Sequence, residues 1–140
     1  MPICLIWFTV VAFAAGCSTM SVNTDYSVDA DGLLHSTLDK AMWLSTRTGP
    51  QPAWIQYEFD KAYKLYQLVV WNSNQMIEGL LGFGAKKVTI ETSTDGATWT
   101  PVANVPEFSR APGIPGYAAN TTVNLGGVDA KFVKLTIASN

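Results

Sequence analysis

Polar residues that could hold a sugar gather in one segment of the chain. Four of them carry amide or carboxylate side chains: Asn72, Asn74, Gln75 and Glu78. Phe83 follows them. Proteins bind sugars through planar hydrogen-bonding groups together with an aromatic ring against the apolar side of the sugar. The segment therefore predicts carbohydrate binding. The alternatives are that the asparagines bond to their own turn and that Phe83 packs into a core.

The residues that common catalytic sites need are scarce. His35 is the single histidine, and both cysteines, Cys4 and Cys17, lie near the N-terminus. A Ser-His-Asp triad needs a base, an orienting acid and a nucleophile in contact, and zinc usually needs several His or Cys ligands. Glu78 has no obvious second acid for the carboxylate pair of a glycosidase. The sequence predicts a chain that is not an enzyme, although it leaves open a catalytic domain elsewhere in a longer protein.

A β-hairpin is predicted directly after this polar segment. Val88, Ile90 and Thr92 alternate with polar residues, which is typical of a strand buried on one face. Asp95-Gly96 supplies the positive φ of a tight turn, and residues 98–100 begin the return strand.

Other segments with the same period surround this hairpin. Strands are expected over 54–59, 65–71, 121–125 and 132–137, with turns at 60–62 and 126–127. Three glycines in 76–85 predict a long loop without a stable helix. The pattern indicates an all-β fold, an antiparallel β-sandwich, with core packing favoured for three tryptophans: Trp43, Trp54 and Trp99.

Three motifs, which occur along the chain in the order typical of one known family, resemble that family. They are Ser93-x-Asp95-Gly96-x-x-Trp99, the upstream strand Trp54-Ile-Gln-Tyr-Glu-Phe59 and the downstream strand Ala130-Lys-Phe-Val-Lys-Leu-Thr-Ile137. Together they resemble discoidin domains, also called coagulation factor 5/8 type C domains, over residues 25–140. The resemblance implies a jelly roll. Family members usually continue with a closing C-terminal strand, which we expect this chain to lack.

The resemblance also implies further site residues. Discoidin-like domains often wrap a structural Ca²⁺ in an Asp-Gly segment ahead of a Thr and a Trp, and Asp29, Asp31 and Thr37 correspond to it here. Oxygen ligands on an irregular loop suit Ca²⁺. Solvated turn carboxylates are the alternative. His35 and Arg47 lie in loops that, in carbohydrate-binding relatives, emerge at the same end of the sandwich.

The N-terminus predicts export. Residues 3–15 are apolar except for Thr9. A segment of this length is too short for a helix that crosses a bilayer core about 30 Å thick, but it suits a signal peptide. Ala14-Ala15-Gly16-Cys17 resembles a bacterial lipobox, so we expect residues 1–16 to be a signal peptide and Cys17 to be lipidated. An ordinary signal peptide or a misassigned start codon are the alternatives. Residues 17–24 would tether the domain to the cell envelope, at the outer membrane in a Gram-negative cell.

The composition limits the class of protein and its partners. The chain has 140 residues, 48% of them hydrophobic, which allows one domain with a single core. The net charge is −2 and the basic residues are scattered, so nucleic acid is not an expected partner.

Two hypotheses of function follow from these patterns. The first is a carbohydrate-binding module that holds a glycan through the loops around residues 72–83. The second is a lipid-binding module like the coagulation-factor branch, with Leu80, Leu81 and Phe83 entering a membrane surface. The lack of basic residues around this loop argues against anionic lipid. Protein adhesion stays open as a third class, and the oligomeric state is not indicated.

Overall fold

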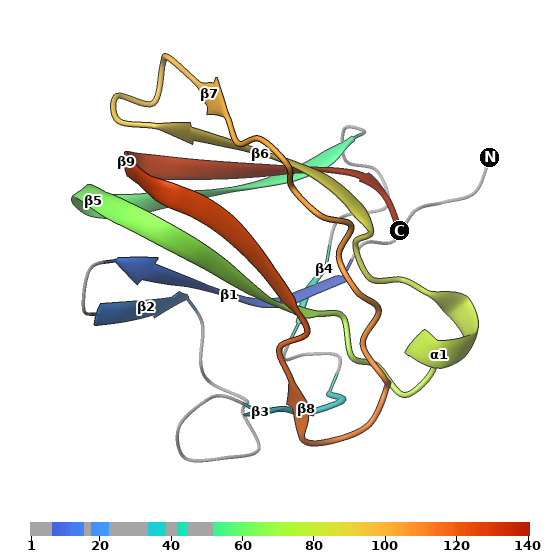
Figure 1. The fold of residues 1–140 in the computed structure, drawn as a ribbon. Coiled ribbons are helices and arrows are strands. Elements are labelled where there is room, and N and C mark those ends of the chain that lie inside the picture. Colours follow the sequence, from blue (N-terminus) through green and yellow to red (C-terminus); the bar gives the residue numbers. More distant parts are fainter. Residues whose placement is uncertain (1–6, 16–17, 23–33, 39–41, 45–51) are drawn as a thin grey trace.

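The computed structural model describes residues 7–15, 18–22, 34–38, 42–44 and 52–140. One helical turn, α1 (Glu78–Leu81), accompanies the strands (Figure 1). The strands are β1 (Trp7–Ala15), β2 (Ser18–Val22), β3 (Leu34–His35), β4 (Trp43–Leu44), β5 (Ala53–Asn72), β6 (Lys87–Ser93), β7 (Thr100–Pro101), β8 (Tyr117–Ala118) and β9 (Thr121–Ser139). All pairings among them are antiparallel, which confirms the predicted all-β class.

Most strands belong to one sheet of seven. Its order is β2-β1-β5-β9-β6-β7, with β4 paired to β1, while β3 and β8 form a separate pair. Both halves of β5 and β9 send side chains into the same core: Ala53 and Leu68 from β5, Val123 and Ile137 from β9. The two long strands therefore bend, and one sheet folds over to supply both layers of the sandwich (Figure 1). This confirms the predicted antiparallel β-sandwich.

The bends fall where the sequence predicts turns, but the strands do not end there. The pairing of β5 with β9 shifts register between Glu58 and Tyr63, and again between Leu65 and Gln67. Opposite the second shift, Gly126 and Gly127 have φ of 68° and 78°. The prediction of two separate strands on each side was wrong, because the extra residues are absorbed at the two register shifts while the ladder continues on either side of them.

The packing of the strands confirms the period-two pattern and corrects one tryptophan. Val88, Ile90 and Thr92 of β6 are all buried, as predicted. Trp54, predicted in the core, is 52% exposed, because its neighbour Ile55 faces the core and successive side chains point to opposite faces. Trp99 is half-buried, with its ring 6.4 Å from that of Phe132. The side chain of Trp43 lies outside the described part.

The described part of the apolar N-terminal segment lies in the sheet. Residues 7–15 form β1, which pairs with β5 from Phe8↔Asn72 to Ala15↔Leu65. The prediction of a cleaved signal peptide concerns processing of the chain and stays a prediction. In the part of the chain that is described, no helix has the length and hydropathy to cross a membrane.

Candidate functional site

The loops at one end of the sandwich meet around α1, on the right in Figure 1. We call this region the α1 end; it consists of β3 with residues 36–38, the loop 73–86 and the loop 108–116. The loop 73–86 contains a helical turn where the sequence predicted none. Gly82 ends this turn with φ of 64°, and its N–H donates to the Glu78 carbonyl at 2.9 Å. Gly82 is one of the three glycines from which a loop without a helix was predicted, and it forms the C-cap of the helical turn.

Asn74 joins three segments of the α1 end. Its side chain is fully buried. Its Nδ2 donates to the carbonyl oxygens of Ser36, at 3.1 Å, and Ile114, at 2.8 Å. Its Oδ1 accepts from the Gly113 N–H at 2.9 Å. One amide side chain thus makes the hydrogen bonds of three backbone groups, one just after β3 and two in the loop 108–116.

Glu78 closes the loop 73–86 on itself. Its side chain is 1% exposed. Oε1 accepts from the Gly84 N–H at 3.0 Å, and Oε2 accepts from the Phe83 N–H at 3.2 Å and from Ser73 Oγ at 3.3 Å. The carboxylate is therefore surrounded by donors from its own loop, which offset the cost of burying it.

Asn72 ties the end of β5 to both neighbouring loops. Its Nδ2 donates to the carbonyl oxygens of Ala85, at 2.7 Å, and Ser109, at 3.0 Å. Its amide packs directly under Gly84, where a Cβ would lie 2.7 Å from Asn72 Oδ1. Only glycine leaves room for this contact.

Tyr117 of β8 completes this arrangement. Its Oη accepts from the Asn72 N–H at 3.3 Å and donates to Asn120 Oδ1 at 2.6 Å. Burial raises the pKa of Tyr117 to about 12. The phenol therefore stays neutral and holds both bonds at physiological pH.

The structure brings most of the predicted sugar-binding residues together. Asn72, Asn74 and Glu78 are buried and bonded to the protein, while Gln75 and Phe83 are half-buried in the same loop. His35 lies at the same end, but in strand β3 and not in a loop as predicted; it is buried, and its imidazole packs 5.2 Å from the Trp71 ring. The three buried groups shape the loops, and their binding role stays a prediction. Arg47, Cys17, Asp29 and Asp31 lie outside the described residues.

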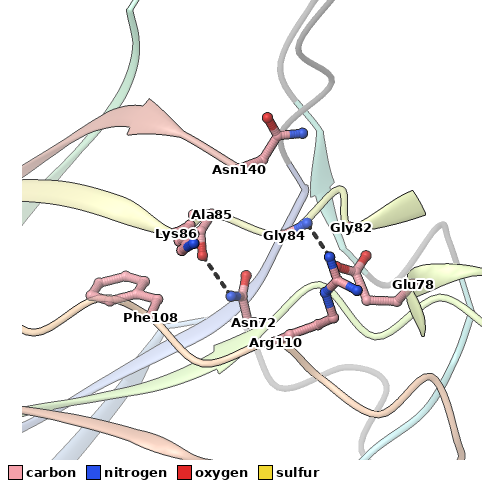
Figure 2. Close-up of a pocket in the computed structure, with 9 residues that line it drawn as sticks. All are labelled: Asn72, Glu78, Gly82, Gly84, Ala85, Lys86, Phe108, Arg110 and Asn140. Atoms are coloured by element: carbon pink, nitrogen blue, oxygen red, sulfur yellow. Dashed lines mark hydrogen bonds between the residues drawn. The ribbon is translucent and has the colours of Figure 1, made fainter. Parts of the chain in front are cut away.

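A cavity of about 350 Å³ opens beside these buried groups (Figure 2). Its lining combines polar, charged and small residues with one aromatic: Asn72, Glu78, Gly82, Gly84, Ala85, Lys86, Phe108, Arg110 and Asn140. Arg110 was not predicted as a site residue, since it lies in a Pro- and Gly-rich loop that nothing in the sequence places beside α1. Its Nη1 donates to the Gly79 carbonyl at 3.3 Å.

Exposed apolar side chains also concentrate at the α1 end. Of the eight large hydrophobic residues exposed in the described part, six lie there: Leu38, Met76, Ile77, Leu80, Leu81 and Ile114. Leu80 is the most exposed, at 87%. A shallow groove of about 360 Å³ runs between Thr37, Leu38 and residues 75–77. The α1 end thus offers a polar cavity with an apolar surface next to it.

The predicted calcium site falls mostly outside the described residues. Of its three ligands only Thr37 is described, and it is half-buried beside the groove. Within the described ranges no three His, Cys, Asp or Glu residues gather as metal ligands would. Calcium binding by Asp29, Asp31 and Thr37 stays a prediction.

Comparison with known proteins identifies the family. No curated protein and no solved structure matches the chain. The F5/8 type C domain matches residues 15–140, which is most of the chain and includes every strand from β2 onward. Domains of this kind are non-catalytic binding modules for carbohydrate, lipid or protein. With its antiparallel sandwich and its loops gathered at one end, the chain belongs to the F5/8 type C domain family.

Proposed function

We propose that this domain binds a glycan at the α1 end, in the cavity of Figure 2. The observation that supports the proposal is the way the cavity is held. Asn72 and Glu78 in its lining are buried and each bonds to three backbone or hydroxyl partners. A cavity fixed in this way loses little conformational entropy when a ligand enters, which favours binding of a polar molecule such as a sugar.

The rim supplies the groups that a sugar needs. Arg110, Lys86 and Asn140 are exposed and can hydrogen-bond to hydroxyl groups. Phe83 is half-buried and lies in the chain between Gly82 and Gly84, which both line the cavity. Its ring would cover the apolar side of a sugar that extends from the cavity. In this arrangement Asn72, Asn74 and Glu78 position the loops that carry the contacting residues.

Glycan binding can be tested with one matched pair of variants. Phe83→Ala should weaken binding to the glycan selected from an array by about tenfold, because it removes the ring contact. Phe132→Ala is the control, since Phe132 is an equally half-buried aromatic that packs on Trp99 away from the α1 end. Isothermal titration calorimetry gives both affinities. Equal affinities for the two variants, or no glycan bound by the wild type, would contradict the proposal.

A lipid surface is the second candidate ligand, and the six exposed apolar side chains favour it. Leu80, Met76 and Leu81 are the most exposed of the six, in that order. Their burial in a bilayer interface would contribute roughly 1 kcal/mol or more for each side chain. Cosedimentation of the domain with liposomes, lost in Leu80→Ser/Leu81→Ser and unaffected by free sugar, would establish this function in place of glycan binding.

Export, lipidation and calcium belong to the same proposal. Lipidation of Cys17 places the domain on the cell envelope, and it requires removal of residues 1–16, including β1. The N-terminal mass of the protein made in a bacterial host distinguishes the lipidated from the unprocessed chain. For Ca²⁺, a chelator should lower the melting temperature of the wild type and leave that of Asp31→Asn unchanged.

A further inference from the structure

Arg110 stands out among the charged residues around the cavity. The backbone is held on both sides of it, by the Ser109 N–H that donates to Thr121 Oγ1 at 2.8 Å and by the buried Ala111. Its own carbonyl accepts from Asn120 Nδ2 at 2.9 Å. The side chain then crosses to α1, where a Cβ on Gly82 would overlap Arg110 Nη2. The absence of a side chain at position 82 therefore leaves room for the guanidinium.

Arg110 is exposed, and its guanidinium has more donors than the one bond it makes to α1. An arginine has five N–H groups, and one of them bonds to the Gly79 carbonyl. The ion pairs of the described residues involve Lys86, Lys87, Lys131 and Lys134, and none of them includes Arg110. An arginine that lines a cavity and forms no ion pair with the carboxylates of the described residues is suited to an anion from outside.

Two other charged residues, Lys86 and Glu78, line the cavity. Lys86 lies on the same rim, and its Nζ is 3.7 Å from Glu107 Oε2 with both side chains more than half exposed, so this pair is weak. The carboxylate of Glu78 is buried, and both its oxygens accept hydrogen bonds from its own loop. An incoming anion must therefore bind on the exposed side of the cavity, at Arg110 and Lys86.

We infer that the cavity at the α1 end takes an acidic sugar, whose carboxylate or sulfate group is held by Arg110 with Lys86 beside it. The inference rests on the proposed glycan function and specifies its ligand. The planar fork of a guanidinium matches the two oxygens of a carboxylate or a sulfate, and the resulting charge-assisted bonds are stronger than those to a neutral hydroxyl.

Matched pairs of acidic and neutral sugars test the inference and show whether the bound group is a carboxylate or a sulfate. Trigalacturonate is compared with its methyl ester, and galactose 6-sulfate with galactose, by calorimetry at low salt. In at least one pair the acidic sugar should bind about tenfold more tightly than its neutral partner, and added salt should reduce this ratio. The pair that shows the ratio identifies carboxylate or sulfate as the group bound.

Variants of Arg110 decide whether the ratio comes from the guanidinium. Arg110→Gln should bring the ratio close to one, Arg110→Lys should keep part of it, and Lys64→Gln, an exposed cation on β5, should leave it unchanged. Melting curves check that each variant is folded. Neutral sugars bound as tightly as acidic ones, or a ratio that survives in Arg110→Gln, would overturn this inference and leave glycan binding standing. Failure of every sugar to bind would overturn the proposed function itself.

Discussion

The two ends of the sandwich are held together in different ways. At the hairpin between β6 and β7, Ser93 Oγ and Asp95 Oδ1 receive the N–H groups of Gly96, Ala97 and Thr98 from at most three residues away. At the α1 end, Asn74 reaches partners 38 to 40 positions away in the sequence. The hairpin closes on itself, whereas the α1 end is held by buried bonds between distant segments.

This difference determines what a substitution does at each end. When an exposed turn loses a hydrogen bond, water replaces the partner and the loss stays local. When a buried amide is removed, several backbone groups are left without partners where water cannot reach them. We therefore expect the α1 end to depend on single side chains far more than the hairpin does.

The largest effect is expected for Asn74→Ala. The substitution leaves the carbonyls of Ser36 and Ile114 and the N–H of Gly113 without their partner, which should lower the free energy of unfolding by about 3 kcal/mol. Asn124→Ala is the control, because Asn124 is exposed and bonds only across its own turn to Gly126. Urea denaturation measures both. A difference of under about 1 kcal/mol between them would show that the two kinds of bonding are equivalent.

Gly84→Ala should have the next largest effect. The added Cβ would lie 2.7 Å from Asn72 Oδ1, and the Asn72 amide is fixed by its bonds to Ala85 and Ser109. We expect a loss of about 2 kcal/mol in urea denaturation. In Gly79→Ala, by contrast, nothing lies within 4 Å of the added Cβ, and alanine favours the helical turn. A Gly84→Ala protein as stable as Gly79→Ala would mean that the Asn72 contact is loose.

Tyr117→Phe tests the same network through pH. The variant loses bonds to Asn72 and Asn120, at a cost of about 1 kcal/mol at pH 7. Burial raises the folded-state pKa of Tyr117 to about 12, above the unfolded value near 10. The stability gained from the neutral phenol is therefore present below pH 10 and is lost as the pH rises toward 12. The wild type should lose more stability than Tyr117→Phe between pH 9 and 11; parallel curves would contradict this.

The smallest effect is expected at the hairpin, for Asp95→Asn. The N–H groups of Thr98 and Ala97, and then Ser93, hold the pKa of Asp95 well below its usual range. Because the folded-state pKa is depressed, its contribution is present above the unfolded pKa near 4 and falls as the pH drops below that value. The melting temperature of the wild type should exceed that of Asp95→Asn slightly at pH 7 and approach it below pH 4. A gap that is constant with pH would mean that the charge of Asp95 plays no part.

The sequence predicted what depends on neighbouring residues. The period of β6 and the positive φ of Gly96 are local, and both are found as expected, although the return strand begins only at Thr100. The bends of β5 and β9 look like turns in the sequence, because a bend within a strand and a turn between strands both use residues such as Gly126 and Gly127 that adopt positive φ. Trp54 was misplaced because a large aromatic was assumed to be buried, although the strand period assigns it to the outer face.

The candidate site was predictable only in its location. The sequence identifies Asn72, Asn74 and Glu78 as polar residues in a loop, but whether such groups face solvent or backbone depends on segments that fold against them from elsewhere. Arg110 is the clearest case, since it reaches α1 from 31 positions away. No local pattern encodes such a contact.

The pairing of β5 with β9 sets when the chain can fold. Ala53 pairs with Ile137, 84 positions later in the sequence (137 − 53), and Val70 pairs with Thr121. During synthesis, β5 must therefore leave the ribosome with one edge open and wait until most of the remaining chain has emerged. Such late-closing contacts slow folding and leave an unpaired strand exposed to neighbours in the meantime. Ribosome-bound chains that end before β9 should accordingly depend on holding chaperones.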